Sequence, residues 1–167
     1  MVIESDDEQP IGWVLAALRI LLGLLWLQNV GWKTPPDFTG VERFVTEGIE
    51  HPTLPPWSWL LEQVIEPAIV PFGWFTLISE LVLAVGLVFG LGTRANAALG
   101  AVLGLSIGLT VARAPNEWGW SYWLLIGAHL AVMAAPQAGR IASLDQSLRR
   151  LVDGRTRLGA LYLRWAS

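Results

Sequence analysis

The chain of 167 residues contains no cysteine. This absence excludes disulfides, thiol redox chemistry, iron–sulfur clusters held by cysteine and thiolate zinc sites. Histidine is scarce as well: His51 and His129 are the two present, and neither has metal-ligand spacing around it. A haem held by two histidines in a membrane needs a pair there, and one of the two lies in a loop. We therefore expect no metal, haem or iron–sulfur cluster.

Charged residues are few as well. Charged residues make up 15% of the chain and hydrophobic residues 53%, with a mean hydropathy of +0.49, whereas a typical soluble domain is about 25% charged. With several long apolar runs, this composition indicates an integral membrane protein whose main partner is the lipid bilayer. No phosphate-binding glycine loop and no basic patch interleaved with aromatics is present, so no nucleic acid is expected.

Four apolar runs are long enough to be membrane spans, because about 20 apolar residues in a helix cover a hydrocarbon core of ~30 Å. They cover roughly residues 11–32, 69–92, 95–112 and 119–136. The sequence therefore predicts an all-α, polytopic four-helix bundle over residues 11–136. An acidic tail precedes it at 1–10, and a basic amphipathic tail follows it at 137–167.

The segment between the first two predicted spans carries two amphipathic patterns. Apolar residues recur at helical spacing from Val41 to Ile49 and again from Trp57 to Ile65, with prolines between the two. We expect two short helices that lie on the membrane surface and roof the bundle. A disordered linker is the alternative, and the apolar faces argue against it.

The distribution of arginine predicts the orientation. The tail after Pro136 holds six arginines against two aspartates, and the positive-inside rule places such a segment in the cytoplasm. Four spans then put the N-terminus in the cytoplasm too and the long first loop outside. Most tryptophans fall at the outer ends of the spans, which is typical of an aromatic belt at one interface.

Three ionisable residues fall within predicted spans: Arg19, Glu80 and His129. A charge at that depth costs at least ~2.5 kcal/mol, so it normally faces other helices or a polar cavity. Counting helical rise places Arg19 within reach of Glu80, directly or through a water or His129. The pair either fixes helix register or lines a polar pocket or proton path. For His129, a hydrogen-bonded packing role is an equal alternative.

Two further patterns concern helix packing. Arg19 begins a stripe of residues three or four apart on the first span, which continues through Gly23, Trp26, either Asn29 or Val30, and Lys33. This stripe should face the bundle interior. Small-residue ridges at Gly100, Gly104 and Gly108, and at Gly86 and Gly90, predict close helix contacts. Thr76 shares a face with Glu80, although a bond to its own backbone is the plainer role for its hydroxyl.

Several short motifs resemble the DoxX/DoxD family of small four-helix membrane proteins. They are Arg19-x-x-x-Gly23 leading to Gly31-x-Lys33, then Glu80-Leu81, Gly86-Leu87-x-x-Gly90 and Thr93-Arg94. The resemblance covers about residues 13–135. It implies a membrane subunit of a redox system in a prokaryotic plasma membrane, of the small-subunit type found in thiosulfate:quinone oxidoreductase. Arg19, Lys33 and Glu80 are the family-pattern positions, and partner protein subunits are expected.

The leading hypothesis is a subunit that binds a quinone or a similar isoprenoid ring lipid in the bundle. Glu80, Arg19 and His129 would supply hydrogen bonds and protons. The residues expected to bind the ring are Trp26, Asn29, Lys33, Trp74, Thr76 and Trp123. The alternative is a non-catalytic subunit that anchors a larger complex. A proton or solute pathway is a third hypothesis, which no pair of interrupted helices supports.

Overall fold

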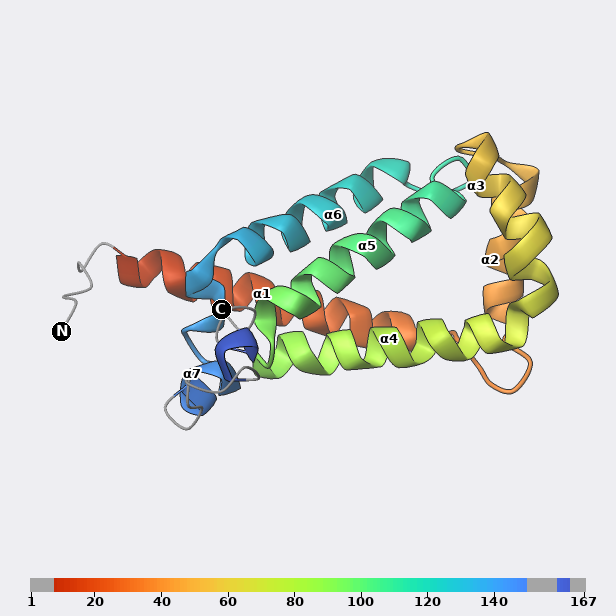
Figure 1. Ribbon diagram of the computed structural model, residues 1–167. Coiled ribbons are helices and arrows are strands. Elements are labelled where there is room, and N and C mark those ends of the chain that lie inside the picture. The colour runs from red at the N-terminus through yellow and green to blue at the C-terminus, as the bar shows by residue number, and fades with distance from the viewer. Residues whose placement is uncertain (1–7, 150–158, 163–167) are drawn as a thin grey trace.

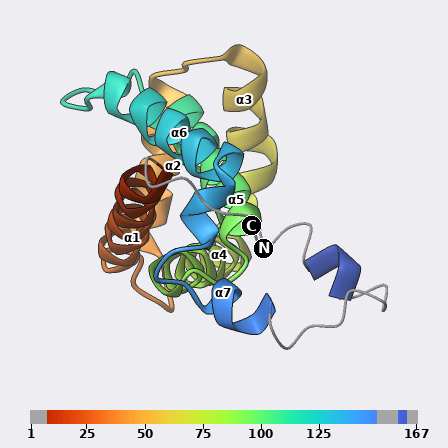
Figure 2. The same ribbon diagram turned by 90° about the vertical axis from the view of Figure 1, so that its left-hand side faces the viewer.

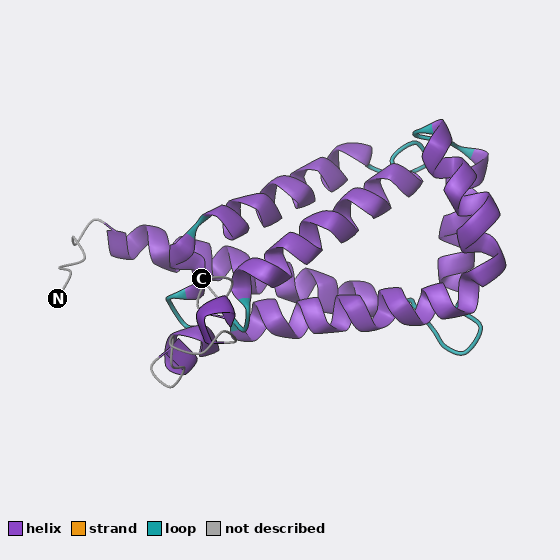
Figure 3. Ribbon diagram, in the orientation of Figure 1, coloured by secondary structure: helices purple, strands orange, loops and turns teal. Residues whose placement is uncertain are grey.

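The structure is a computed structural model that describes residues 8–149 and 159–162. Every regular element in these residues is a helix and none is a strand, so the predicted all-α class is confirmed (Figure 3). The longer helices are α1 (Glu8–Val30), α2 (Thr39–Glu50), α4 (Ile69–Phe89), α5 (Thr93–Val111) and α6 (Gly119–Ala134). The shorter ones are α3 (Pro55–Leu60), η1 (Leu61–Ile65), η2 (Glu66–Ala68), η3 (Pro136–Gly139) and α7 (Leu144–Arg149).

In the described part of the chain, three helical stretches are long and apolar enough to cross a membrane. They are Pro10–Val30, Pro55–Phe89 and Thr93–Val111, while α6 is apolar but has 16 residues. Each predicted span coincides with one of the helices α1, α4, α5 and α6, with ends within about three residues of the predicted ones. The helix α1 begins at Glu8, inside the predicted acidic tail, of which residues 1–7 lie outside the described residues.

The four helices that match the predicted spans form two pairs, which we call the arms, and the axes of the two pairs diverge. The helix α1 packs on α4, and α5 packs on α6 (Figures 1 and 2). The pairs meet where a tight turn at Gly90–Gly92 joins α4 to α5, which we call the turn end. They spread apart toward α2 and α3, which we call the roof end (Figure 1).

Glycines set the close approach within each pair. A Cβ atom on Gly23 would lie 2.8 Å from the backbone nitrogen of Val88 and 2.9 Å from the carbonyl oxygen of Ala84, so α1 and α4 touch backbone to backbone there. On α5, the predicted ridge of Gly100, Gly104 and Gly108 is buried against α6. Small residues at such contacts let two helices approach closely, and the resulting van der Waals packing stabilises their association in lipid.

The roof end is covered by α2, α3 and η1, so this segment is helical rather than an irregular linker. Val41 and Val45 of α2 are buried, and so is Leu61 of η1. The indole nitrogen of Trp57 donates a hydrogen bond to Oγ1 of Thr110 on α5, at 3.0 Å. The roof is thereby tied to the arm formed by α5 and α6.

The turn end is closed by the segment that follows α6. Asp145 is fully buried, and its carboxylate accepts hydrogen bonds from the backbone nitrogens of Gly92 (2.8 Å) and Thr93 (3.0 Å), at the start of α5. The hydroxyl of Tyr162 donates to the same carboxylate at 2.8 Å. Burial, followed by this hydrogen bond, raises the pKa of Tyr162 to about 12. Residues 150–158 and 163–167 of the predicted basic tail lie outside the described residues.

Candidate functional site: a roofed cavity between the helix pairs

The divergence of the two arms leaves a cavity of about 470 Å³ under the roof. Its walls come from α1, α2, α3, η1, α4, α5 and α6 and are mostly apolar. Its aromatic lining includes Trp26, Phe44, Trp57, Phe72, Phe75 and Tyr122. The volume falls within the ~300–1,000 Å³ that is usual for small-molecule sites, and apolar walls with few polar groups are typical of such sites.

One charged pair stands in the wall of this cavity. The ammonium Nζ of Lys33 lies 2.6 Å from Oε2 of Glu80, and the side chains of the two residues are 4% and 3% exposed. The side-chain nitrogen of Asn29 donates to the same Oε2 at 3.3 Å. Lys33 also donates to the backbone oxygen of Asn29 at 3.2 Å. Burial lowers the pKa of Lys33, and the adjacent Glu80 carboxylate opposes that shift.

This geometry leaves hydrogen-bonding capacity for a ligand. Both contacts of the Glu80 carboxylate use Oε2, and no described residue hydrogen-bonds its Oε1. An ammonium carries three protons. Lys33 directs its hydrogen bonds at two oxygens, those of Glu80 and Asn29. One acceptor and one donor therefore remain at the same place in an apolar cavity.

The end of α1 positions the polar residues. Asn29 lies in the last turn of α1, and Lys33 follows one turn later, so both point to the same side. The indole nitrogen of Trp32 donates to the side-chain oxygen of Asn29 at 2.9 Å, which turns the amide nitrogen toward Glu80. The Lys33 ammonium also lies 4.0 Å from the centre of the Trp32 ring, a favourable cation–π contact.

The prediction that Arg19 contacts Glu80 is wrong. Arg19 is fully buried at the turn end, where its guanidinium donates to the carbonyl oxygens of Ala138 (2.8 Å), Ile141 (3.3 Å) and Ala142 (2.6 Å). Side chains lean toward the N-terminus of their helix, so Arg19 leans toward the turn end and Glu80, on an antiparallel helix, leans away from it. Lys33, at the other end of the same stripe, is the partner of Glu80.

His129 is a packing residue in this structure. Its Nε2 accepts a hydrogen bond from the indole nitrogen of Trp26 at 2.9 Å, and its Nδ1 lies 2.8 Å from the carbonyl oxygen of Leu125, to which it donates. Both ring nitrogens are thus occupied, and the ring does not line the cavity. The geometry therefore does not support His129 as a proton donor to a ligand. It agrees with the alternative, a hydrogen-bonded packing role.

The expected aromatic residues are partly different from those observed. Trp26 lines the cavity, but Trp74 and Trp123 do not, contrary to expectation. Trp74 is 44% exposed and packs edge-on against Phe38, and Trp123 is 50% exposed. Thr76 lines the cavity, and its hydroxyl donates to the carbonyl oxygen of Gly73 at 3.0 Å. This bond to its own backbone is the predicted alternative to a binding role.

The aromatic residues that replace them come largely from the roof. Phe44 and Trp57 lie on the apolar faces of the two predicted surface helices, and those faces were the signal available in the sequence. Trp32 follows α1, and Tyr122 lies in the first turn of α6. Neither had a periodicity that marked it as a cavity residue.

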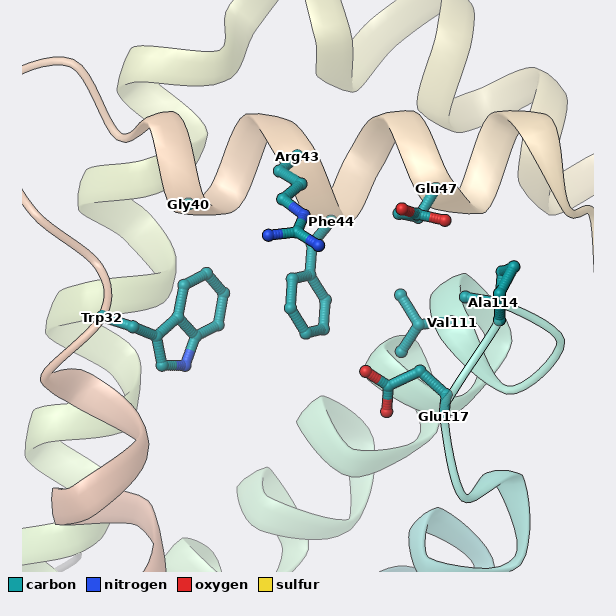
Figure 4. Close-up of a pocket in the computed structure, with 9 residues that line it drawn as sticks. Trp32, Gly40, Arg43, Phe44, Glu47, Val111, Ala114 and Glu117 are labelled. Atoms are coloured by element: carbon teal, nitrogen blue, oxygen red, sulfur yellow. The ribbon is translucent and has the colours of Figure 1, made fainter.

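A second, smaller pocket of about 280 Å³ lies on the other side of the Trp32 and Phe44 rings. These rings are stacked, with centroids 4.8 Å apart, and form a wall shared with the cavity. In Figure 4, Arg43 and Glu47 lie on α2, and Glu117 lies across the pocket on the loop between α5 and α6. This pocket is more polar than the cavity and is not enclosed by the helix arms.

Within residues 8–149 and 159–162, one group of side chains is of the types that could hold a metal ion. Glu47, Glu50 and His51 end α2, and one ligand atom from each lies within 4.8 Å of the others. Glu50 is exposed and the other two are half-buried, so the cluster is on the surface of the roof. It is separate from Lys33 and Glu80 and does not contribute to the chemistry of the cavity.

Comparison with protein-family models, curated proteins and solved structures finds no match for this chain. The residues themselves therefore carry the functional interpretation. They form an apolar, aromatic-lined cavity with one acceptor and one donor held by a buried ion pair. Such a site suits a ligand with a flat apolar ring and one or two polar atoms.

Proposed function

We propose that this protein is a four-helix membrane subunit of a redox system, and that it binds an isoprenoid quinone or a similar ring lipid in the roofed cavity. The observation that carries the proposal is the buried pair of Lys33 and Glu80 in the wall of an otherwise apolar cavity. A quinone ring is flat, apolar and edged by oxygens, and it matches both the aromatic walls and the polar wall.

The residues present fit such a ring. The remaining proton of Lys33 would donate to a ring oxygen, and Oε1 of Glu80 would accept from a ring hydroxyl or hold a proton for it. Trp32 holds Asn29, and Asn29 holds Glu80, so the carboxylate is fixed before a ligand arrives. When bound, a quinone supplies two-electron redox chemistry, and we place the electron donor on a partner subunit.

The arrangement in the bilayer follows from charge and length. With α1, α4, α5 and α6 as spans, the arginines at the turn end, Arg94 and Arg140 among them, lie on the cytoplasmic side. The roof then lies at the outer surface, and both termini lie in the cytoplasm. Large hydrophobic side chains exposed along the arms, such as Leu21, Ile78 and Leu124, would face lipid. The plasma membrane of a prokaryote remains the location that the DoxX/DoxD resemblance favours.

The motif residues of that resemblance also support the proposal. Lys33 and Glu80, two of the three family-pattern positions, meet in the cavity wall. Arg19, the third, holds the turn end together.

A second candidate is a structural subunit that anchors a larger complex. Trp118 and Trp120 favour it, because they stack at 5.9 Å and are 68% and 59% exposed at the roof end. Exposed aromatic pairs are enriched where proteins bind each other, and also where they meet lipid headgroups. In this role the cavity would hold ordinary lipid chains.

A binding titration in lipid nanodiscs tests the proposal. Indoles of Trp26, Trp32 and Trp57 line the cavity, so a naphthoquinone with a polyisoprenoid tail should quench their fluorescence saturably at one molecule per chain. Ser106→Phe would place a ring inside the cavity and should weaken binding at least about tenfold. Leu105→Phe is the matched control, because Leu105 is 43% exposed and does not line the cavity.

Equal binding by the two phenylalanine variants would contradict the cavity as the site. The absence of saturable quenching in the wild-type protein, with the protein folded by circular dichroism, would favour the structural subunit instead.

A further inference from the structure

The most exposed part of the cavity wall identifies the kind of ligand more closely. Resting on the proposed function, we infer that the tail of the bound lipid leaves the cavity sideways into the bilayer, between α4 and α5, across Phe75 and Val102. The ligand is then a lipid with a ring head inside the bundle and a hydrocarbon tail outside it. It is not a ring that arrives from water.

Phe75 and Val102 are the most exposed of the residues that line the cavity. Phe75 on α4 is 60% exposed and Val102 on α5 is 62% exposed, yet both contribute to the cavity wall. A side chain that belongs both to a cavity wall and to the outer surface stands at an opening. Phe72 and Leu99, which also line the cavity, are half-buried beside them. The rim is therefore apolar, as a hydrocarbon tail requires.

The divergence of α4 and α5 explains why the opening is there. The two helices are packed tightly at the turn end, where Leu83, Leu87 and Ala97 are buried in one cluster. From the turn they separate toward the roof (Figure 1). At ~1.5 Å per residue, Phe75 stands ~21 Å from the turn-end terminus of α4, and Val102 stands ~14 Å from that of α5. Both heights fall within the hydrocarbon core of a bilayer ~30 Å thick.

The other boundaries suit a tail less well. The roof is closed by buried Val41, Val45 and Leu61. The gap between α1 and α6 has a polar rim, because Ser121 and Tyr122 line the cavity there. The hydroxyl of Tyr122 donates to the Glu117 carboxylate at 2.5 Å, outside the cavity. Leu25 on α1, at 47% exposed, is less open than either residue of the α4–α5 rim.

The experiment compares two probes with the same ring. One is a naphthoquinone with a polyisoprenoid tail, and the other is the same ring with a methyl group in place of the tail. Val102→Trp would fill the opening, and Val82→Trp is the matched control, since Val82 is 56% exposed on α4 and does not line the cavity. Binding of each probe, labelled with tritium, is measured in nanodiscs by filtration.

We expect Val102→Trp to weaken binding of the tailed ring at least about tenfold while the methyl ring binds within about twofold of wild type. Val82→Trp should bind both as the wild type does. Unchanged binding of the tailed ring by Val102→Trp overturns the inference, and so does an equal loss of both rings. If the wild-type protein binds neither ring, the proposed function itself fails, which is a different result.

A second measurement needs no substitution. A tailed naphthoquinone with a photoreactive diazirine on the first isoprene unit is irradiated in the wild-type complex, and the labelled peptides are mapped by mass spectrometry. Label on α4 near Phe75 and on α5 near Val102 supports the inference. Label centred on Leu25 and Ser121 places the tail between α1 and α6 and overturns it.

Discussion

The pair of Lys33 and Glu80 makes a quantitative prediction for the substitution Glu80→Gln. The two side chains are 4% and 3% exposed and their charged atoms are 2.6 Å apart, so the pair is almost fully desolvated. Glutamine keeps the size of glutamate and can still accept from Asn29, but it leaves the Lys33 ammonium without a counter-charge. Removing one partner of a buried pair costs about 3–5 kcal/mol.

We therefore expect Glu80→Gln to lower the free energy of unfolding by about 3 kcal/mol, which is ~150-fold in the unfolding equilibrium. Removing both charges should cost less, since a buried pair replaced by neutral residues is often close to neutral in stability. The double variant Lys33→Met/Glu80→Gln should accordingly be more stable than Glu80→Gln alone, by at least about 1.5 kcal/mol.

Reversible unfolding in mixed detergent micelles, followed by circular dichroism, measures both values. The control is Glu66→Gln, which neutralises an exposed carboxylate of η2 and should change stability by less than about 0.5 kcal/mol. The reasoning is refuted if Glu80→Gln matches this control, or if the losses of Glu80→Gln and Lys33→Met simply add in the double variant.

Three further predictions concern packing and are measured by the same unfolding assay. Arg19→Leu leaves three carbonyl oxygens at the turn end without their donor and should lower the free energy of unfolding by at least about 3 kcal/mol. In the double variant this loss of stability should add to the loss caused by Glu80→Gln. If Glu80→Gln instead restores the stability of Arg19→Leu, the two residues interact after all. Gly100→Ala should be destabilising, by about 1–3 kcal/mol, because its new Cβ meets the His129 ring. Gly127→Ala, with no atom within 4 Å of its Cβ position, should instead stabilise by about 0.5–1 kcal/mol; equal effects of the two would contradict the close contact of α5 and α6. Trp26→Phe removes the donor to buried Nε2 of His129 and should cost about 1–3 kcal/mol, whereas an unchanged stability would show that this bond is replaced by another.

The sequence predicts the helices well because their signals are local. Apolar length defines the long helices, and the amphipathic repeats of residues 41–49 and 57–65 define the helices of the roof. The stripe on the first span is also confirmed: Arg19 and Trp26 are fully buried and Lys33 is 5% exposed. A residue's place on a helical wheel depends on that helix alone, so one sequence is sufficient to predict it.

Contacts between helices were harder to predict. Counting helical rise placed Arg19 at a depth near that of Glu80. In the structure Arg19 instead bonds to the segment that follows α6, and no sequence pattern predicts where that segment lies. Lys33, three residues beyond the end of α1, reaches Glu80 because the chain turns there. The cavity itself arises from the divergence of two helix pairs. That divergence is a property of the assembled fold and not of any single helix.

The central claim is that one ring lipid occupies the cavity of each chain. Native mass spectrometry of the wild-type protein, released in a mild detergent from the membranes in which it was made, measures this directly. We predict a main adduct with the mass of a single quinone or similar ring lipid, which is lost in Ser106→Phe and kept in Leu105→Phe. A bare chain, or a spread of phospholipid adducts equal in all three proteins, would contradict the claim.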